Sequence, residues 1–364
     1  MQKRFFQAIG FLFFTQLLFP QVSGGNQYKF QVSVDPRVEL VSIAFYLAGN
    51  PEYRKGRINS YLVEIESNFG SNRHPLVLEA IRLRQKRGIS YDAPMSLAIH
   101  VSNDGNFQER IPFSPIPEGL DKRWTSDESR KFCLLAREFS KQTNFQVFFD
   151  GHKLFYEQAV KRLRNLLDTN AHGEWFDRFF GFTPKGKFNI ILAPVNGPHS
   201  YGPRFISGDT QEFYCILGIW GSDPGGNPYF EKDTIPWIMH EFSHSYLNPL
   251  VSKFETKLAS AGSILFEAAK PKMLKMAYVD WKTMIEESLV RAVVIQYVSA
   301  YDGVSSAEKL VQTEIQNGFP CMRELVDLLG EFERTREAHA SLETFFPRVV
   351  DLFNAYSKNL VKKE

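Results

Sequence analysis

The segment Thr234–Pro249, with the sequence TIPWIMHEFSHSYLNP, restricts the possible folds more than any other part of this chain. Asp233 or Thr234 can cap a helix here, and Pro236 falls in its first turn, where a missing N–H does no harm. The pair Asn248-Pro249 favours a helix end. Apolar residues recur at helical spacing, at Ile235, Ile238, Met239 and Phe242. This stripe has to be buried, so we expect a helix that packs against a sheet. We call this segment the motif helix.

The charged residues of the motif helix are few and lie close together. Between Trp237 and Leu247 the only side chains that carry charge near neutral pH are His240, Glu241 and His244. A lone carboxylate in a buried helix costs free energy unless it has a charged or metal partner. The two histidines are four residues apart, so their imidazoles lie on one face of the helix and can bind the same ion. The segment therefore predicts a metal site.

The pattern His-Glu-x-x-His has a specific chemical use on a helix. Zinc binds the two imidazoles and lowers the pKa of a bound water towards neutrality, and the glutamate takes the proton of that water. We therefore expect Zn2+ to be bound by His240 and His244, with Glu241 as the general base of a hydrolytic reaction. A pair of hydrogen-bonded histidines in an ordinary core is the alternative interpretation.

A catalytic zinc usually has three protein ligands and one open position. The residues after His244 contain neither the glycine nor the third histidine of the longer H-E-x-x-H-x-x-G-x-x-H pattern. The later helical segment WKTMIEESLVRAVV offers Glu286 and Glu287 instead. Glu287 is favoured because it shares a helix face with Arg291, which could hold it in place. Three alternatives remain open. Glu286 could be the ligand instead, and His199 is a weaker candidate. Both glutamates could also be solvated, with Glu287 and Arg291 forming a surface ion pair.

The first residues, MQKRFFQAIGFLFFTQLLFPQVSGG, have the layout of a secretory signal peptide. Lys3 and Arg4 precede an apolar run from Phe5 to Phe19, and small residues follow it. The run is short for a membrane span, and no second long run follows. We expect residues 1–24 to be removed on export, so that the mature protein is secreted or periplasmic and has no stable membrane span. An uncleaved signal anchor is the alternative.

The composition is that of a globular protein, with 364 residues of which 43% are hydrophobic. Loss of Lys3 and Arg4 would leave equal numbers of basic and acidic residues, since the chain has 43 Lys and Arg and 41 Asp and Glu. A balanced chain gives no electrostatic case for binding nucleic acid or an anionic membrane. Three distant cysteines predict no disulfide framework, and Cys133 and Cys215 lie in apolar runs typical of a core.

The other segments place the motif helix in an α+β chain. Strands are predicted at the mature start, YKFQVSV, and at MSLAIHVS (95–102), KFNIILAPVN (187–196) and EFYCILGIWG (212–221). After the motif helix the pattern is mostly helical to the end. The segment FSPIPEGLDKRW suggests a boundary, which divides the chain into an N-terminal α/β subdomain at 25–120 and a catalytic domain at 121–364.

The motif helix and the later segment EESLVRA (286–292) together resemble the gluzincin branch of zinc metallopeptidases. The wider pattern adds VDPRVELVSIAFYLAGNPEY (34–53) and HEFSHSYLNP (240–249). It is closer to an uncharacterised family of secreted bacterial zincin-like proteins, a domain of unknown function. The resemblance covers nearly the whole mature chain. It implies a zincin-like fold, with a small mixed sheet before the motif helix, and a metallopeptidase activity with Glu287 as third ligand.

The resemblance also implies that the strand before the motif helix binds the extended backbone of the substrate. The corresponding residues are Leu217, Gly218, Ile219 and Trp220, and Gly218 would let a substrate approach closely. Arg291 departs from thermolysin-type gluzincins, which have a carboxylate four residues after the ligand glutamate. An oxyanion stabiliser is required as well, and the candidates left open are Tyr246, Tyr278, Tyr297, Tyr301, His199 and Arg204.

The sequence therefore predicts an exported zinc hydrolase that acts on a peptide or protein. Two alternatives remain, which are a non-catalytic protein of zincin fold that binds a peptide or glycan, and a zinc amidase that acts on cell-wall amides. Glu241 weighs against the first alternative, because a structural zinc site needs no general base.

Overall fold

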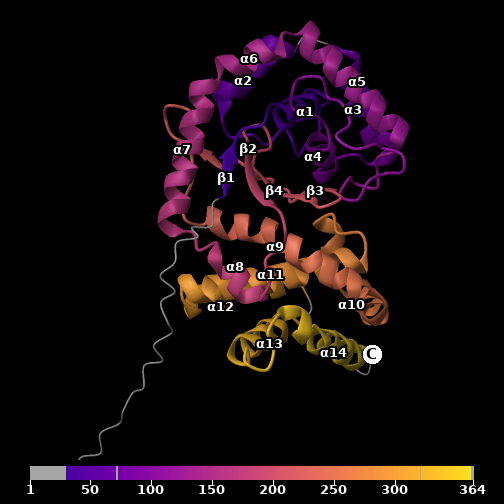
Figure 1. The fold of residues 1–364 in the computed structure, drawn as a ribbon, viewed down its shortest axis with the longest axis vertical. Helices are drawn as coiled ribbons and strands as arrows, with labels where there is room; N and C mark the ends of the chain where they lie inside the picture. The colour runs from indigo at the N-terminus through magenta and orange to yellow at the C-terminus, as the bar shows by residue number, and fades with distance from the viewer. Residues whose placement is uncertain (1–29, 71–72, 320, 362–364) are drawn as a thin grey trace, which may run out of the picture.

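The computed structural model describes residues 30–70, 73–319 and 321–361 (Figure 1). The predicted signal peptide, residues 1–24, lies outside the described residues, as do residues 25–29 of the predicted N-terminal subdomain. The described chain is an α+β protein in which a small mixed sheet lies between two groups of helices. The predicted α+β class, with strands before the motif helix and helices after it, is confirmed at this level.

The central sheet has the strand order β1-β2-β4-β3. The first three strands in this order are parallel, and β3 pairs antiparallel with β4. The predicted strands at 187–196 and 212–221 are confirmed and lie next to each other, and a separate pair, β5 and β6, follows them. The strands are β1 (Gln31–Ser33), β2 (Lys187–Ala193), β3 (Arg204–Ser207), β4 (Thr210–Gly218), β5 (Gly221–Ser222) and β6 (Pro228–Tyr229).

One group of helices lies above the sheet in Figure 1 and comes from the N-terminal part of the chain. It consists of α1 (Pro36–Leu47), α2 (Asn59–Phe69), α3 (Pro75–Arg87), α4 (Asp92–Ile99), α5 (Ser126–Gln142) and α6 (Phe145–Gly151). Helix α7 (Lys153–Asn170) then runs down the side of the sheet, where it contacts β1 and β6.

The second group lies below the sheet and includes the motif helix, α9, directly beneath β4. The helix α11 packs along α9, and the others surround this pair. The group consists of α8 (Glu174–Phe180), α9 (Thr234–Lys253), α10 (Glu255–Lys275), α11 (Trp281–Tyr301), α12 (Val304–Asn317), α13 (Met322–Arg334) and α14 (Leu342–Val361).

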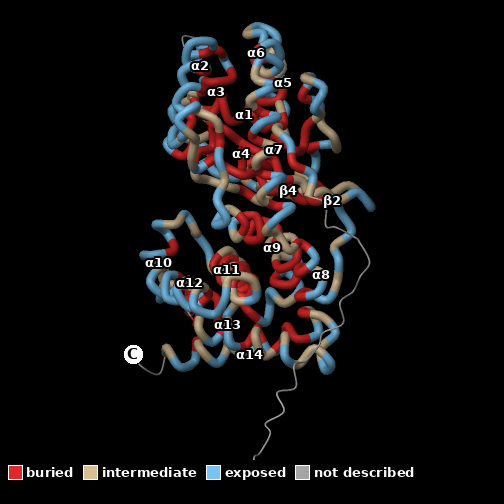
Figure 2. The backbone as a smooth tube through the Cα atoms, turned by 90° about the vertical axis from the view of Figure 1, so that its left-hand side faces the viewer, coloured by how far each residue is buried: buried red, intermediate tan, exposed pale blue. Residues whose placement is uncertain are grey.

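The sheet separates two hydrophobic cores, and its side chains alternate between them. In β2, Ile190 and Leu192 belong to the core around α9, whereas Ile191 and Ala193 belong to the core of the N-terminal helices. The same alternation runs along β4, where Cys215 lies on the α9 side; its predicted burial is confirmed. Figure 2 shows buried residues on both sides of the sheet. Because both faces are covered, β2 and β4 are apolar over most of their length.

The strand predicted at 95–102 is wrong. Residues 95–99 belong to the helix α4, and of the three residues that follow only Val101 takes part in a β-bridge, with Glu109. Every residue from Ala93 to Ile99 is buried. An apolar run that is covered on all sides has neither the period of a strand nor that of a helix, so periodicity could not distinguish the two. Pro94 in the first turn is the feature that suits a helix.

The predicted end of the motif helix at Asn248-Pro249 is also wrong, since α9 continues to Lys253 with Pro249 inside it. A proline within a helix removes one backbone hydrogen bond and clashes with the preceding turn. The additional turn carries Leu250 and Val251, which are both buried in the core. Their burial offsets the cost of the proline, and a sequence pattern does not reveal such a tertiary contribution.

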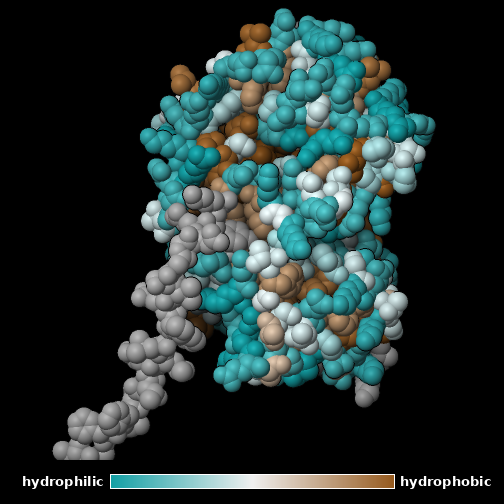
Figure 3. Space-filling model, viewed as in Figure 1, coloured by the Kyte–Doolittle hydropathy of each residue, from teal (hydrophilic) through white to brown (hydrophobic). Residues whose placement is uncertain are grey.

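The surface of the protein is mostly hydrophilic on the face seen in Figure 3, where hydrophobic residues occur in small separate groups. None of the described helices is long and apolar enough to cross a membrane.

A buried carboxyl group lies among the N-terminal helices, at Glu39 of α1. Its side chain is 0% exposed, and its Oε1 accepts a hydrogen bond of 2.6 Å from the Tyr61 hydroxyl, which in turn contacts the hydroxyl of Tyr156. Its Oε2 has no hydrogen-bond partner among the described residues. Burial raises the pKa of Glu39 to about 7, although the bond from Tyr61 acts in the opposite direction.

This raised pKa predicts a pH-dependent stability. The folded protein holds the Glu39 proton more tightly than the unfolded chain. Below a pH of about 4.5 the carboxyl is protonated in both states, so its burial costs no free energy of ionisation. The free energy of unfolding then falls as the pH rises to about 7 and levels off above it, by about 3 kcal/mol in total. Glu39→Gln removes this term, so urea unfolding should show the variant gaining about that amount over the wild type between these pH values. A difference that stays constant with pH would contradict the charge penalty.

Candidate metal centre

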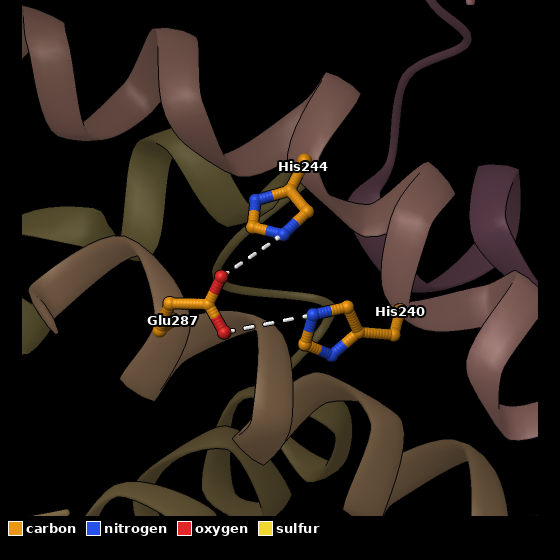
Figure 4. A group of neighbouring side chains, drawn as sticks. All are labelled: His240, His244 and Glu287. Atoms are coloured by element: carbon orange, nitrogen blue, oxygen red, sulfur yellow. Dashed lines mark ion pairs between the residues drawn. The ribbon is translucent and has the colours of Figure 1, made fainter. Parts of the chain in front are cut away.

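Three side chains from two neighbouring helices converge beneath the sheet. His240 and His244 project from α9 and Glu287 from α11, and Figure 4 shows both imidazoles pointing at the carboxylate. The Nε2 atom of His240 lies 3.6 Å from Oε2 of Glu287, and Nε2 of His244 lies 3.4 Å from Oε1. The three donor atoms all lie within 4.8 Å of one another. The side chains are 10–17% exposed, which leaves the group a small opening to solvent.

The two nitrogen–oxygen distances are longer than direct hydrogen bonds and fall in the range expected for two ligands of one metal ion. A charge-assisted N–H···O bond is usually about 2.7–2.9 Å long. Two ligands on a tetrahedral zinc, each bonded at about 2.0–2.2 Å, are separated by about 3.3–3.6 Å. The two nitrogen–oxygen distances match the second value. His240, His244 and Glu287 could therefore hold a metal ion, and imidazole with carboxylate is a donor set that zinc accepts.

The apolar side of α9 determines which way the histidines point. Phe242 packs against the sheet, with its ring 5.0 Å from that of Phe188 on β2 and 5.3 Å from that of Phe30. Ile238 and Met239 are fully buried in the same core. This packing fixes the rotation of the helix, so the histidine face turns towards α11. The predicted apolar stripe is the reason that the two imidazoles meet Glu287.

A set of hydrogen bonds holds the carboxylate in place. The Tyr278 hydroxyl donates to Oε2 of Glu287 at 2.9 Å. The Arg291 guanidinium donates to the Tyr278 hydroxyl at 3.1 Å and to Glu287 Oε2 at 3.4 Å. Its other Nη atom donates to Glu314 at 2.9 Å, and the guanidinium lies over the ring of Phe319. The predicted contact between Arg291 and Glu287 is therefore present, and it belongs to a larger network.

Two positioning residues were missed by sequence reasoning. The sequence marks Tyr278 only as one of several oxyanion candidates, and its place in the loop before α11 carries no periodic signal. The Nδ1 atom of His244 contacts Oδ1 of Asn248 at 3.2 Å, which orients this imidazole so that Nε2 faces Glu287. Asn248 lies four residues after His244 on the same helix, and this spacing could have revealed the contact.

The electrostatics of the three side chains follow from their burial and their proximity. Burial lowers the pKa of His240 to about 3, so its imidazole is neutral and has a lone pair to offer. Burial also disfavours a charged His244, but the Glu287 carboxylate outweighs it and raises the pKa of His244 to about 9. Burial would raise the pKa of Glu287, yet the two imidazoles and Arg291 hold it well below its usual range. Glu287 therefore stays ionised in this site.

Glu241 lies beside the three side chains without belonging to them. It is buried, and burial raises its pKa to about 7. Gly202 packs directly against it, because a Cβ atom at Gly202 would lie 2.9 Å from Oε2 of Glu241 and 3.0 Å from its carbonyl oxygen. The predicted base is thus a carboxyl outside the ligand group, enclosed on one side by the backbone of the loop before β3.

The predicted substrate strand has mostly buried side chains. Leu217 and Ile219 are 0% exposed, and each belongs to one of the two cores. The space that a side chain at Gly218 would occupy is taken by the carbonyl oxygens of Gly197 and His199, 2.2 and 2.4 Å from an added Cβ. The close approach at Gly218 is therefore made by the chain's own backbone. Trp220 is the one predicted position whose side chain is open to solvent.

The other candidates lie in separate environments. Glu286 is half-buried, and burial raises its pKa to about 7, but it is not part of the three-residue group. His199 faces the ring of Tyr91, and its Nε2 has no hydrogen-bond partner among the described residues. The remaining oxyanion candidates have structural contacts: Tyr246 with Asp177, Tyr297 with the His172 backbone, Tyr301 with Arg178, and Arg204 with Glu118.

The network around Glu287 makes Tyr278 testable. Tyr278→Phe removes the donor at 2.9 Å, so the carboxylate becomes freer to rotate. We expect metal affinity to fall by about 10–100-fold, as is usual when a partner of a ligand is lost. Competition with a chelating dye measures this change. Tyr301→Phe is the matched control, since its hydroxyl contacts Arg178 at 3.4 Å in an exposed position and should not affect the metal. Equal affinities in the two variants would argue against a positioning role for Tyr278.

The fold and the site together define an α+β protein with a buried His-His-Glu group between the motif helix and a later helix. The model of the family described as Domain of unknown function (DUF4932) matches residues 30–352. The chain therefore belongs to this family. No curated protein and no solved structure matches the chain.

Proposed function

We propose that this protein is an exported zinc-dependent hydrolase that cleaves peptides or proteins. The observation that carries the proposal is the convergence of His240, His244 and Glu287, with the two imidazole nitrogens 3.6 and 3.4 Å from the carboxylate oxygens and the three donor atoms within 4.8 Å of one another. Glu241, next to the first ligand but outside the ligand group, supplies the group that a hydrolytic site needs in addition. A purely structural zinc site would have no use for this carboxyl group.

The chemistry divides between the ion and the side chains. Zinc bound by the three side chains would act as a Lewis acid on a substrate carbonyl and lower the pKa of a nearby water. Glu241 accepts the proton that the attacking water loses and passes it to the leaving nitrogen. Tyr278 and Arg291 keep the Glu287 carboxylate directed at the histidines. Asn248 keeps Nε2 of His244 directed at the same point.

The proposal includes a zincin-like arrangement of the chain. It is supported by a motif helix that packs under a mixed sheet with an antiparallel edge strand, and by a third ligand on a later helix. Arg291 is the departure from the thermolysin pattern. Here that position carries a guanidinium, which pairs with Glu314 of α12 as well as with Glu287.

The test of this proposal is metal analysis followed by a cleavage assay. We expect about one zinc per chain in the purified mature protein, lost in His240→Ala, and cleavage of a random peptide library that stops when zinc is chelated and returns when it is restored. A protein that binds no zinc when supplied with it would contradict the proposal. A zinc-bound protein that cleaves cell-wall glycopeptides and no simple peptide would favour an amidase, and one that cleaves neither would favour a binding protein.

Export is a separate part of the proposal and rests on the signal-like residues 1–24. N-terminal sequencing of the protein recovered from the cells that make it should find a start near residue 25. Intact Met1 on a protein retained in the cytoplasm would contradict export.

A further inference from the structure

Two tryptophans lie exposed next to the candidate metal centre. Trp220 follows the end of β4 and is 45% exposed, and Trp237 is on α9 and is 38% exposed. Their ring centroids are 5.1 Å apart, so the two indoles form one aromatic surface. Tryptophan offers a large apolar area, and exposing it to water is unfavourable unless the surface binds something.

This aromatic surface adjoins a predicted metal ligand. Trp237 lies three residues before His240, and the two ring centroids are 6.2 Å apart. The ring of His240 is in turn 5.1 Å from that of His244. A group that rests on the indoles therefore lies beside the proposed metal ligands.

The core does not require either indole. Ile235 and Ile238 pack α9 into one core. At the end of β4, Leu217 packs into the same core and Ile219 into the other. Both rings stay partly open to solvent outside the two cores, as residues of a binding site do.

The shape of the surface indicates what it binds. The two rings are tilted by 45° to each other, so they do not form one flat face. A flat sugar ring could stack on only one of the two faces, whereas a compact apolar side chain can contact both. Tyr229, 42% exposed and paired with Gly221 across the β5–β6 hairpin, places a third aromatic ring next to the residue that follows Trp220.

We propose that Trp220 and Trp237 form the subsite that receives a bulky apolar side chain of the substrate, beside the bond to be cleaved. This inference rests on the proposed peptidase function. It assigns the specificity of the same site, namely peptides with residues such as Phe or Leu next to the scissile bond.

The first experiment measures binding without cleavage. The zinc-loaded Glu241→Gln protein is titrated with peptides that differ only at one central residue, which is Phe, Leu, Ala or Ser, and tryptophan fluorescence is followed. We expect the Phe and Leu peptides to bind at least about tenfold more tightly than the Ala and Ser peptides. This preference should disappear when Trp220→Ala is added. Equal binding of all four peptides, or a preference that survives Trp220→Ala, would overturn the subsite.

The second experiment measures cleavage sites in a random peptide library by mass spectrometry. Wild-type protein should enrich large apolar residues on one side of the cleaved bond, and Trp220→Ala and Trp237→Phe should lose this enrichment while still binding zinc. Leu154→Ala, which removes a 74% exposed side chain on α7, is the matched control and should keep it. Cleavage with no apolar enrichment in wild type would refute the subsite alone. An absence of all cleavage would refute the peptidase function, and the fluorescence titration would still decide whether the subsite exists.

Discussion

Replacing Glu241 by Gln is expected to leave zinc bound and to lower the rate of hydrolysis by about 10²–10⁴-fold, the usual contribution of a general base. Glutamine has nearly the same shape, so it fits against Gly202 as the glutamate does. It cannot accept the proton of the attacking water. The fall should appear in kcat, measured on any peptide that wild type cleaves, and the zinc content should match that of wild type.

Glu286→Gln is the matched control for this result. Glu286 is a half-buried carboxyl near His244, so its loss removes a nearby negative charge without removing the proposed base. We expect this variant to keep its zinc and most of its activity. If Glu241→Gln hydrolyses peptides at the wild-type rate, Glu241 is not the base. If the two variants lose activity equally, the effect is one of local charge.

Replacing Glu287 by Gln should have the largest effect on the metal itself. Zinc sites bind with about 10–16 kcal/mol in total, so the loss of one of three ligands is expected to cost several kcal/mol, or about 10²–10³-fold in affinity. The variant also leaves the Arg291 guanidinium without one of its carboxylate partners in a buried position, which adds to the disturbance. Chelator competition followed by elemental analysis measures the change.

The same control separates the two glutamates that the sequence offered as third ligand. Glu286→Gln should bind zinc as wild type does, because only Glu287 has both oxygens within 3.6 Å of the imidazoles. The opposite outcome, zinc lost in Glu286→Gln and kept in Glu287→Gln, would show that α11 presents its other face to the ion. The predicted role of Tyr278 would then also be wrong, since Tyr278 binds Glu287.

The His-His-Glu group could be predicted largely because its geometry is local to two helices. The spacing of His240 and His244 is a property of one helix turn, and the preference for Glu287 over Glu286 followed from its four-residue spacing to Arg291. The structure brings these residues together as the pattern indicated. The substrate, the reaction and the identity of the ion depend on more than spacing, and they stay predictions.

The features that the sequence did not reveal depend on tertiary packing. The helix α4 is covered on all sides, so its residues have no polar face to mark a period. The continuation of α9 past Pro249 depends on burial of Leu250 and Val251 in a core built by distant segments. Gly218 suggested an approach by a ligand, but its space is filled by the backbone of a loop about twenty residues earlier. No local pattern carries such information.

Because the two faces of the sheet pack into different cores, substitutions on the two faces are constrained by different residues. Ile190 and Ile191 are neighbours in β2, yet the first packs in the core that holds the motif helix and the second packs in the other core. Changes at Ile190 must therefore be compensated by residues such as those of α9, and changes at Ile191 by residues of α1. In a set of homologous sequences, substitutions should then co-vary in two independent groups that alternate along β2 and β4, and only one group should track the histidine-bearing helix.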